Sequence, residues 1–422
     1  MIREAILRTF YDAASMQRWN DHIRPVELTE LDKQAHKMII AFVVGRFEET
    51  VKNTPINWRL LIEGGIFEFL QRIIITDIKP TVFHKIIAEK GDEINRWVLN
   101  QLKDSTHEIK GDFVKRFEQY LFDTEYAAAE KKILKASHYL ATSWEFGIIY
   151  NLSPRSLGIE ETKRAIENEI AQHDDLIGVQ KWYDNKIYGF LDICGTLRFQ
   201  QRWAQAQRVP KTSVLGHMLI VAMFSYLCSI EVDACDRRLY NNYFTALFHD
   251  LPEALTRDIV SPVKRSVKGL EEILSKYEQE QLDEKIFPLL PIVWHDEIRY
   301  LIIEPFKSRV LNAEAQDKEG TKVCRGWFQT RPKGTEEEAQ SEVISVSSEE
   351  INKHFNQDKY SPVDGEIIKA CDCLAAYMEA ALSIEHGIAS HHLTEGKKSI
   401  YHAWKDKHIA GIHFGQIFDY FK

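Results

Sequence analysis

The chain has 422 residues, of which 44% are hydrophobic and 28% are charged, and it contains 20 Gly and 12 Pro residues. This length can bury a sizeable core and predicts two domain-sized units, while the composition excludes disordered and fibrous proteins. The 54 Lys and Arg residues face 63 Asp and Glu residues, for a net charge of -9. A mildly acidic chain argues against a protein that coats nucleic acid.

The N-terminus carries charged residues where a signal peptide needs an apolar core. The clearest apolar run, Met38 to Val44, is much shorter than the roughly 20 residues of a membrane span. We therefore expect a cytoplasmic protein without a membrane segment. The six cysteines do not resemble a disulfide framework, and we expect them to be buried thiols.

Helical periodicity extends along most of the chain. Apolar residues recur at three- and four-residue spacing, and several segments are apolar nearly all round, as helices inside a bundle are. The clearest segments, in chain order, are residues 37–49, 178–193, 217–230, 270–287 and 366–384. The sequence lacks the glycine-rich phosphate loops and the nucleophile elbow of the common α/β enzymes. These patterns predict an all-α fold.

One stretch interrupts the helical rhythm. From about 306 to 360, β-branched residues alternate with Gly, Pro and a run of Glu residues. This pattern predicts a small β-hairpin or a mobile insertion. Either a solvated loop without a role or a lid or partner-binding arm is compatible with the sequence.

Candidate catalytic residues begin at His249 in the segment LFHDLPEALTRD. Asp250 is adjacent to it, and on a helix His249 and Glu253 share one face. Asp258 follows five residues after Glu253. Burying these polar groups without partners would cost several kcal/mol. A divalent cation would satisfy them together.

Two further polar residues lie in apolar helical segments. His217 begins the segment HMLIVAMFSYL, and Asp372 lies in the middle of EIIKACDCLAAYMEAAL. Together with His249 and Asp250 they form a mixed nitrogen and oxygen set. Such a set suits one divalent metal ion such as Co²⁺, Mn²⁺, Mg²⁺, Fe²⁺ or Zn²⁺.

The pattern H…HD…D resembles that of the HD superfamily of metal-dependent phosphohydrolases, which are helical bundles. The fuller set, with Arg202 and Trp203 before His217 and with Glu253 in HDxxE, is similar to that of the bacterial 5′-deoxynucleotidases. These enzymes remove phosphate from deoxyribonucleoside 5′-monophosphates. The resemblance covers roughly residues 197–386, apart from the insertion.

The resemblance implies a role for each matching residue. It makes four residues the metal ligands: His217, His249, Asp250 and Asp372. It gives Glu253 the activation of water and places Asp258 near the scissile phosphate. It makes Arg202 a phosphate contact and packs Trp203 against the sugar.

The first half of the chain repeats this pattern in a degenerate form. Placing AHKMIIAFVV over GHMLIVAMFS pairs His36 with His217, and the same offset pairs Asp77 with Asp258. Arg18-Trp19 corresponds to Arg202-Trp203 at a different offset, 184 instead of 181. In the other site positions the first half has different residues, namely Glu68 for His249, Phe69 for Asp250, Arg72 for Glu253 and His138 for Asp372. Arg72 would either imitate part of the ion's charge and hold an anion or form a salt bridge.

We therefore expect residues 1–195 to form a degenerate, catalytically inactive HD-like domain. Residues 196–422 would form the catalytic HD domain, with the insertion at about 306–360. The two copies would make an internal pseudo-dimer, and a homo-oligomer stays open.

The leading hypothesis is removal of the 5′-phosphate from a deoxyribonucleoside monophosphate or a similar nucleotide. A deoxynucleoside triphosphate triphosphohydrolase or a phosphodiesterase of a signalling nucleotide is the first alternative. A nucleotide sensor without catalysis is the second. In each case the expected partner is a small nucleotide.

Overall fold

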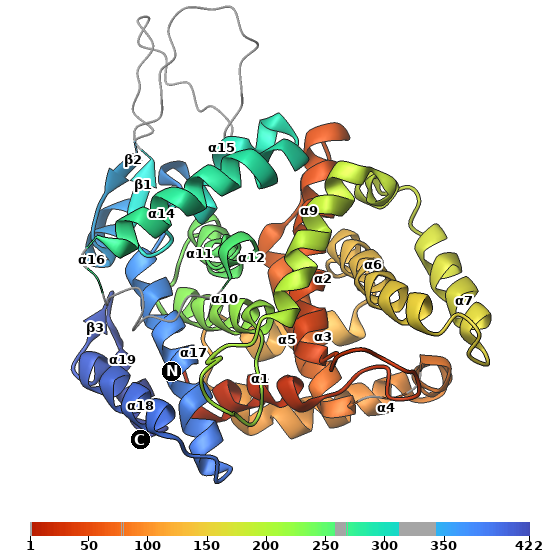
Figure 1. Cartoon of the computed structure of the whole chain (residues 1–422), viewed down its shortest axis with the longest axis horizontal. Coiled ribbons are helices and arrows are strands. Elements are labelled where there is room, and N and C mark those ends of the chain that lie inside the picture. Colours follow the sequence, from red (N-terminus) through yellow and green to blue (C-terminus); the bar gives the residue numbers. More distant parts are fainter. Residues whose placement is uncertain (1, 77, 79, 258–266, 268, 312–342) are drawn as a thin grey trace, which may run out of the picture. The chain divides into compact units, whose positions relative to one another are not determined.

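The computed structural model describes residues 2–76, 78, 80–257, 267, 269–311 and 343–422 (Figure 1). Within these ranges the chain is built from helices and two short antiparallel strand pairs, which confirms the predicted all-α class. The chain forms two compact units, Met1–Ile220 and Val221–Lys422. The predicted domain division after residue 195 stays a prediction.

The first unit is a bundle around the long helix α2 (Glu30–Val51), which contacts α1, α3, α6, α8 and α9. Thr29 begins this helix, because its side chain accepts a hydrogen bond from the amide of Asp32 at 3.2 Å. The other helices of the unit are α1 (Glu4–Ser15), α3 (Trp58–Ile75), α4 (Pro80–Thr106), α5 (Phe113–Phe122), α6 (Ala128–Leu152), α7 (Ile159–Ala171), α8 (Ile177–Gln180), η1 (Lys181–Tyr183), α9 (Asn185–Thr196) and η2 (Leu197–Phe199).

The predicted helix over 178–193 is broken in the structure. Helix α8 ends at Gln180, a short 3-10 turn follows, and α9 begins at Asn185. The break occurs at Asp184, whose carboxylate accepts a hydrogen bond from the amide of Lys186 at 2.9 Å. A residue that caps a new helix competes with continuation of the old one. The apolar periodicity alone does not reveal this competition.

Helix α10 (Val214–Glu231) is the one helix among the described residues that is apolar and long enough to cross a membrane. However, 94% of its apolar window is buried inside the protein. A core helix of a bundle has the same composition.

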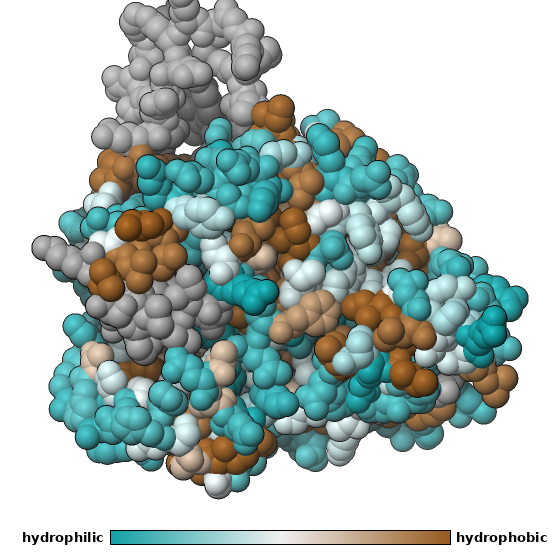
Figure 2. Space-filling view, in the orientation of Figure 1, coloured by the Kyte–Doolittle hydropathy of each residue, from teal (hydrophilic) through white to brown (hydrophobic). Residues whose placement is uncertain are grey.

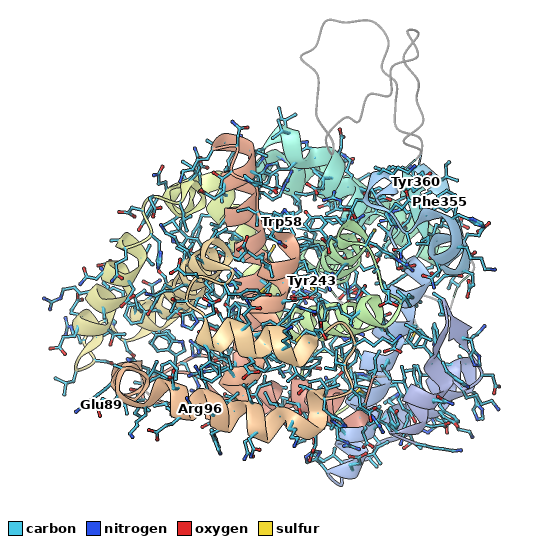
Figure 3. The ribbon with its side chains drawn as sticks, turned by 180° about the vertical axis from the view of Figure 1, so that it is seen from behind. Trp58, Glu89, Arg96, Tyr243, Phe355 and Tyr360 are labelled. Atoms are coloured by element: carbon cyan, nitrogen blue, oxygen red, sulfur yellow. The ribbon has the colours of Figure 1, made fainter. Side chains whose placement is uncertain are left out.

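The second unit is organised around α11 (Asp236–Phe248), which packs against α15 (His295–Ile302) and α17 (Gly365–Glu385). Tyr243 of α11 lies among the helices in Figure 3, whereas Glu89 and Arg96 mark the exposed helix α4 of the first unit. The remaining helices are α12 (Glu253–Thr256), α14 (Leu270–Gln281), η3 (Leu282–Ile286), η4 (Phe287–Leu289), η5 (Ile292–Trp294), α16 (Ser348–Glu350), η6 (Ile351–Phe355), η7 (Asp358–Tyr360), α18 (His391–Trp404) and α19 (Phe414–Asp419).

Strands β1 (Arg309–Leu311) and β2 (Val343–Ser345) pair antiparallel, with Val310 opposite Ile344. They lie inside the predicted insertion and confirm a small hairpin there. The segment that joins them, 312–342, lies outside the described residues. A second pair, β3 (His408–Ile409) and β4 (Ile412–His413), precedes α19.

The described cysteines are free thiols, as the sequence predicts. The Sγ atoms of Cys228 and Cys371 lie 3.7 Å apart, and both residues are buried. Burial raises the pKa of the Cys371 thiol, so this sulfur acts as a small apolar group. On the face shown in Figure 2, hydrophilic residues predominate and apolar residues form separate spots.

The loops before α2 and α10 have the same backbone hydrogen bonds. Gln17 pairs with Thr29, and Gln201 pairs with Ser213, so both partners are shifted by 184 positions (201 − 17 and 213 − 29). In both loops the Trp that follows the Arg has a left-handed φ of 57°. The helix caps match as well, because the Ser213 hydroxyl accepts from the amide of Gly216 at 2.9 Å.

This equivalence corrects the alignment expected from the sequence. An offset of 184 places Lys33, rather than His36, at the position of His217. Thr76 follows the end of α3 and Arg257 follows the end of α12, and both residues have a φ of 66°. At these two helix ends the offset is therefore 181 (257 − 76). The amides of these two residues donate to the carbonyls of Arg72 and Glu253, at 2.9 and 2.8 Å. The pairing of Arg72 with Glu253 therefore agrees with the backbone.

A buried ionic network joins α11 to α17. The Arg238 guanidinium donates to both carboxylate oxygens of Asp364, at 2.6 and 3.0 Å, and neither side chain is exposed. The side-chain amide of Asn242 donates to the same carboxylate at 2.8 Å, and its carbonyl accepts from the amide of Asp364. The network sets the axial register of the two helices, since its partners fit in one arrangement only.

The substitution Asp364→Ala tests this role. It leaves Arg238 buried without its carboxylate, so we expect the free energy of unfolding to fall by about 3–5 kcal/mol. Chemical denaturation followed by circular dichroism measures the change. Glu304→Ala, which removes the partner of Lys307 in an exposed pair, is the control and should have a much smaller effect. Equal small effects would show that apolar packing alone sets the register.

Candidate metal centre

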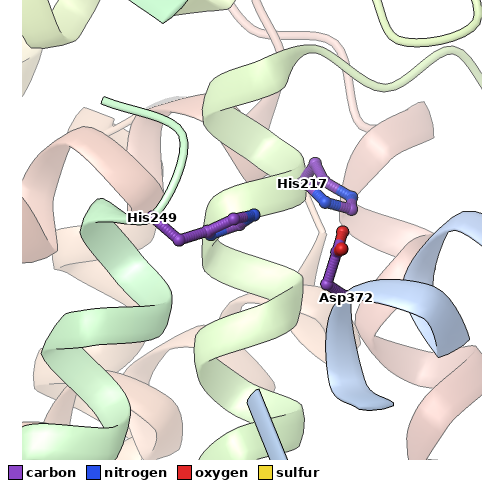
Figure 4. Close-up of side chains that lie close together, drawn as sticks. All are labelled: His217, His249 and Asp372. Carbon is purple, nitrogen blue, oxygen red and sulfur yellow. The ribbon is translucent and has the colours of Figure 1, made fainter. Parts of the chain in front are cut away.

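Three predicted ligands meet in the structure. His217 is on the first turn of α10, His249 caps the end of α11, and Asp372 lies on α17. One ligand atom from each residue lies within 4.8 Å of the others (Figure 4). Both imidazoles are buried, so these groups converge in a place of low solvent access. Convergence of two imidazoles and a carboxylate at this spacing fits one bound ion.

The tautomer of His249 is fixed by the helix that carries it. Its Nδ1 lies 2.7 Å from the carbonyl oxygen of Ala246. A carbonyl only accepts, so Nδ1 carries the proton and Nε2 carries the lone pair. This is the arrangement in which a backbone carbonyl orients a metal-binding imidazole.

The fourth predicted ligand, Asp250, lies beside His249. One of its carboxylate oxygens is 3.2 Å from Nε2 of His249. A lone pair and a carboxylate oxygen repel each other at this distance unless a proton or a cation lies near both. This local repulsion, together with the donor types, fits a divalent cation held by His217, His249, Asp250 and Asp372.

Lys369 is a site residue that the sequence analysis missed. Its ammonium lies 2.8 Å from a carboxylate oxygen of Asp372 and 4.1 Å from the centre of the Phe306 ring. Burial alone would lower the pKa of Lys369, but the carboxylates of Asp372 and Asp250 raise it overall. The sequence does contain a signal for this contact, because Lys369 lies three residues, about one helical turn, before Asp372 and residues at this spacing are neighbours on a helix.

The other predicted residues are only partly placed. Glu253 is buried and begins α12, immediately after the turn that follows His249. Asp258 lies outside the described residues. Arg202 and Trp203 are half-buried in the loop that precedes α10. Their roles stay predictions.

His36 is not a metal ligand. Its Nε2 lies 2.9 Å from the carbonyl oxygen of Leu191 and must donate to it. Its Nδ1 therefore accepts from the Arg198 guanidinium, at 3.2 Å. Both nitrogens are therefore engaged in hydrogen bonds within the first unit. Burial, followed by the charge of Arg198, lowers the pKa of His36 to about 3.

Lys33 lies where the corrected alignment places it. Its side-chain nitrogen hydrogen-bonds Nδ1 of His138, the residue that the sequence alignment pairs with Asp372. Lys37, one turn along α2, pairs with Glu68, the residue that corresponds to His249. Tyr120 also donates to Glu68, at 2.6 Å. In the first half these lysines therefore have an imidazole and a carboxylate as their partners.

The comparisons with known proteins agree with this centre. Residues 194–401 match the family model of the HD domain. This match supports an HD domain in that part of the chain, and HD domains are typical of metal-dependent phosphohydrolases. Neither a curated protein nor a solved structure matches the chain.

The ligand assignment predicts the effect of Asp372→Ala. Loss of this carboxylate should weaken Mn²⁺ binding at least about 100-fold, since loss of a mere outer partner already costs 10–100-fold. Calorimetric titration of the metal-free protein measures it. Lys369→Met on the same helix is the matched control, and it should keep or strengthen binding because a competing cation is gone. Unchanged affinity in Asp372→Ala would contradict the assignment.

The neutral state of His36 predicts a dependence of stability on pH. The unfolded imidazole binds a proton below about pH 6.5, whereas the folded one does so only near pH 3. The contribution of His36 to the free energy of unfolding is therefore fully present above about pH 6.5. As the pH falls this contribution is lost, and at pH 5.5 the loss is about 1.4 kcal/mol. His36→Gln should lack this part of the loss between pH 7.5 and 5.5, as measured by denaturant unfolding. Identical losses in both proteins would contradict the neutral assignment.

Proposed function

We propose that the chain removes the 5′-phosphate from a deoxyribonucleoside monophosphate. The convergence of His217, His249 and Asp372 inside an HD domain is the observation that supports this most. A divalent cation held there would lower the pKa of a bound water and neutralise charge on the phosphoryl oxygens. The motif Arg202-Trp203 favours a nucleoside monophosphate over other phosphate esters.

In this proposal the protein's own side chains have separate tasks. The Glu253 carboxylate takes the proton of the attacking water and passes it to the leaving oxygen. The Lys369 ammonium, next to Asp372, limits the repulsion between the carboxylates and an approaching dianion. The Arg202 guanidinium donates to phosphoryl oxygens, and Trp203 packs against the sugar.

We also propose that the first half is a degenerate HD copy. The matched bridges, caps and left-handed Trp residues of the two loops support it. In the first loop Arg18 donates to Glu145 at 2.9 Å and to Glu30 at 2.7 Å. Val214 occupies the position of Glu30 in the second loop, which therefore lacks this carboxylate. Arg18 is neutralised by two buried carboxylates, as expected for a copy that has lost its substrate.

A nucleotide panel tests the proposed reaction. The protein loaded with Mn²⁺ or Co²⁺ should release inorganic phosphate from deoxyribonucleoside monophosphates and much less from ribonucleotides. Release of triphosphate from deoxynucleoside triphosphates, or cleavage of a cyclic or bridged nucleotide, would support the other enzyme class instead. Binding of nucleotides without any turnover would support a sensor.

Glu253→Gln separates chemistry from metal binding. Because the amide cannot accept the proton, we expect kcat to fall on the order of 100-fold. Mn²⁺ affinity should change little, since Glu253 is not in the group of converging ligands. Steady-state kinetics and calorimetric titration on the same preparation measure both quantities. A parallel loss of metal and rate would make Glu253 a ligand.

A further inference from the structure

We propose that Phe306 and Lys369 form a further phosphate-binding element at the edge of the metal centre, in which the Phe306 ring holds the Lys369 ammonium where it binds a phosphoryl oxygen. Both residues belong to the second unit. The inference deepens the function proposed above and rests on it, because it assigns one more contact to the phosphate group of the same substrate. Phe306 acts through Lys369 and is therefore a positioning residue.

The first observation is the place of the Phe306 ring. Its centre lies 5.8 Å from the centre of the His249 imidazole and 4.1 Å from the Lys369 ammonium. At the shorter distance a cation is attracted to the negative face of an aromatic ring. The same ammonium donates to a carboxylate oxygen of Asp372 at 2.8 Å. The ammonium is therefore held between an aromatic ring and one of the converging ligands.

The second observation is the support of the turn that carries Phe306. This turn joins α15 to β1, and the buried Arg309 of β1 fixes it. The Arg309 guanidinium donates to the carbonyl of Glu304 at 2.8 Å and to that of Lys307 at 2.9 Å. It also donates to the carbonyl of Tyr300. One side chain therefore fixes the backbone on both sides of Phe306.

The third observation is the contact between this turn and α17, the helix that carries Lys369 and Asp372. Helix α17 begins at Gly365, and a Cβ atom at that residue would overlap the backbone of Phe306 and Lys307. Any other residue at position 365 would therefore push the turn away from the helix. Because Gly365 has no side chain, the turn lies directly on the start of α17, and the ring and the ammonium keep one relative position.

The fourth observation is access and charge. Phe306 and Lys369 are half-buried, and 40% of the Lys369 side chain is exposed. Asp372 accepts one of the three ammonium protons, so an incoming oxygen can accept another. The carboxylates of Asp250 and Asp372 match the charge of one divalent cation. The positive charge of Lys369 therefore adds to the attraction of a phosphate dianion.

The alternative is that both residues have only a structural role. In that case Phe306 packs beside His249, and Lys369 forms an ordinary ion pair with Asp372 on one helix. The two possibilities differ in how their effects combine. If the ring acts through the ammonium, its loss should not change phosphate binding further once the ammonium has been removed. A structural role of the ring would weaken binding equally with and without the ammonium.

The experiment measures binding to the full-length protein loaded with Mn²⁺. The probes are inorganic phosphate and the phosphonate analogue of deoxyadenosine monophosphate, in which a methylene group replaces the ester oxygen and prevents hydrolysis. In calorimetric titrations Lys369→Met should bind both probes at least about tenfold more weakly, the effect of losing one charge-assisted hydrogen bond. The matched control is Lys359→Met, because Lys359 lies 4.6 Å from the centre of the Tyr360 ring, and it should leave binding unchanged.

The ring is tested in the same titrations. Phe306→Leu removes the cation–π contact but keeps an apolar side chain, so it should weaken binding about fivefold. Phe306→Tyr keeps the ring and should bind like the parent. In the Lys369→Met background Phe306→Leu should have no further effect. Mn²⁺ affinity, titrated separately, should not fall in any of these variants.

The outcomes separate this proposal from the proposed function. Equal binding by Lys369→Met and its parent, or an equal loss from Phe306→Leu in both backgrounds, would overturn the proposal. The proposed function would still stand if the parent hydrolyses the monophosphate. Lysine-dependent binding of inorganic phosphate without binding of the nucleotide analogue would support the phosphate-binding element and contradict a nucleotide substrate. Absence of binding of either probe to the parent would overturn both.

Discussion

The burial of charge between apolar helices is the constraint on which this structure depends. Helices α11 and α17 carry His249 and Asp372, and they cannot slide along each other without separating Arg238 from Asp364. Both side chains are fully buried, so a separation would leave two unpaired charges out of contact with water, which is energetically costly. The ionic network therefore fixes the spacing of two metal-binding residues that lie more than 100 positions apart in the sequence. Apolar packing alone would tolerate small shifts that a metal centre does not.

The first unit satisfies the same constraint with different residues. Glu145 accepts from Arg18, Trp19 and Arg198, and this carboxylate ties the loop before α2 to the segment that follows α9. Burial would raise the pKa of Glu145, but the charges of Arg18 and Arg198 lower it overall, so the carboxylate stays ionised. A loop that holds a Trp at positive φ needs such support, since that conformation costs about 1 kcal/mol or more for a residue with a side chain.

The sequence predicted the helical class and the residues of the metal centre more readily than the register of the first half. Periodicity and polar residues in apolar segments are local signals, and they located His217, His249 and Asp372. The pairing of His36 with His217 failed because it matched a histidine before an apolar run. The offset between the two halves is 184 at the loops before α2 and α10 but 181 at the ends of α3 and α12. The first half is therefore three residues (184 − 181) longer between these two points. The Arg-Trp pairs already indicate an offset of 184 in the sequence, and the backbone hydrogen bonds of the loops support it.

A similar limit explains the residues that were missed. Lys369 is significant because of the charges of Asp372 and Asp250 around it, and Lys33 is significant because it is completely buried against the imidazole of His138. Neither property is visible in a local pattern, since each depends on helices distant in sequence. The two lysines differ in the groups that surround them. In the second unit Lys369 pairs with Asp372, one of the converging ligands. In the first unit Lys33 hydrogen-bonds His138 and Lys37 pairs with Glu68, so side chains of the same unit serve as the partners of both lysines.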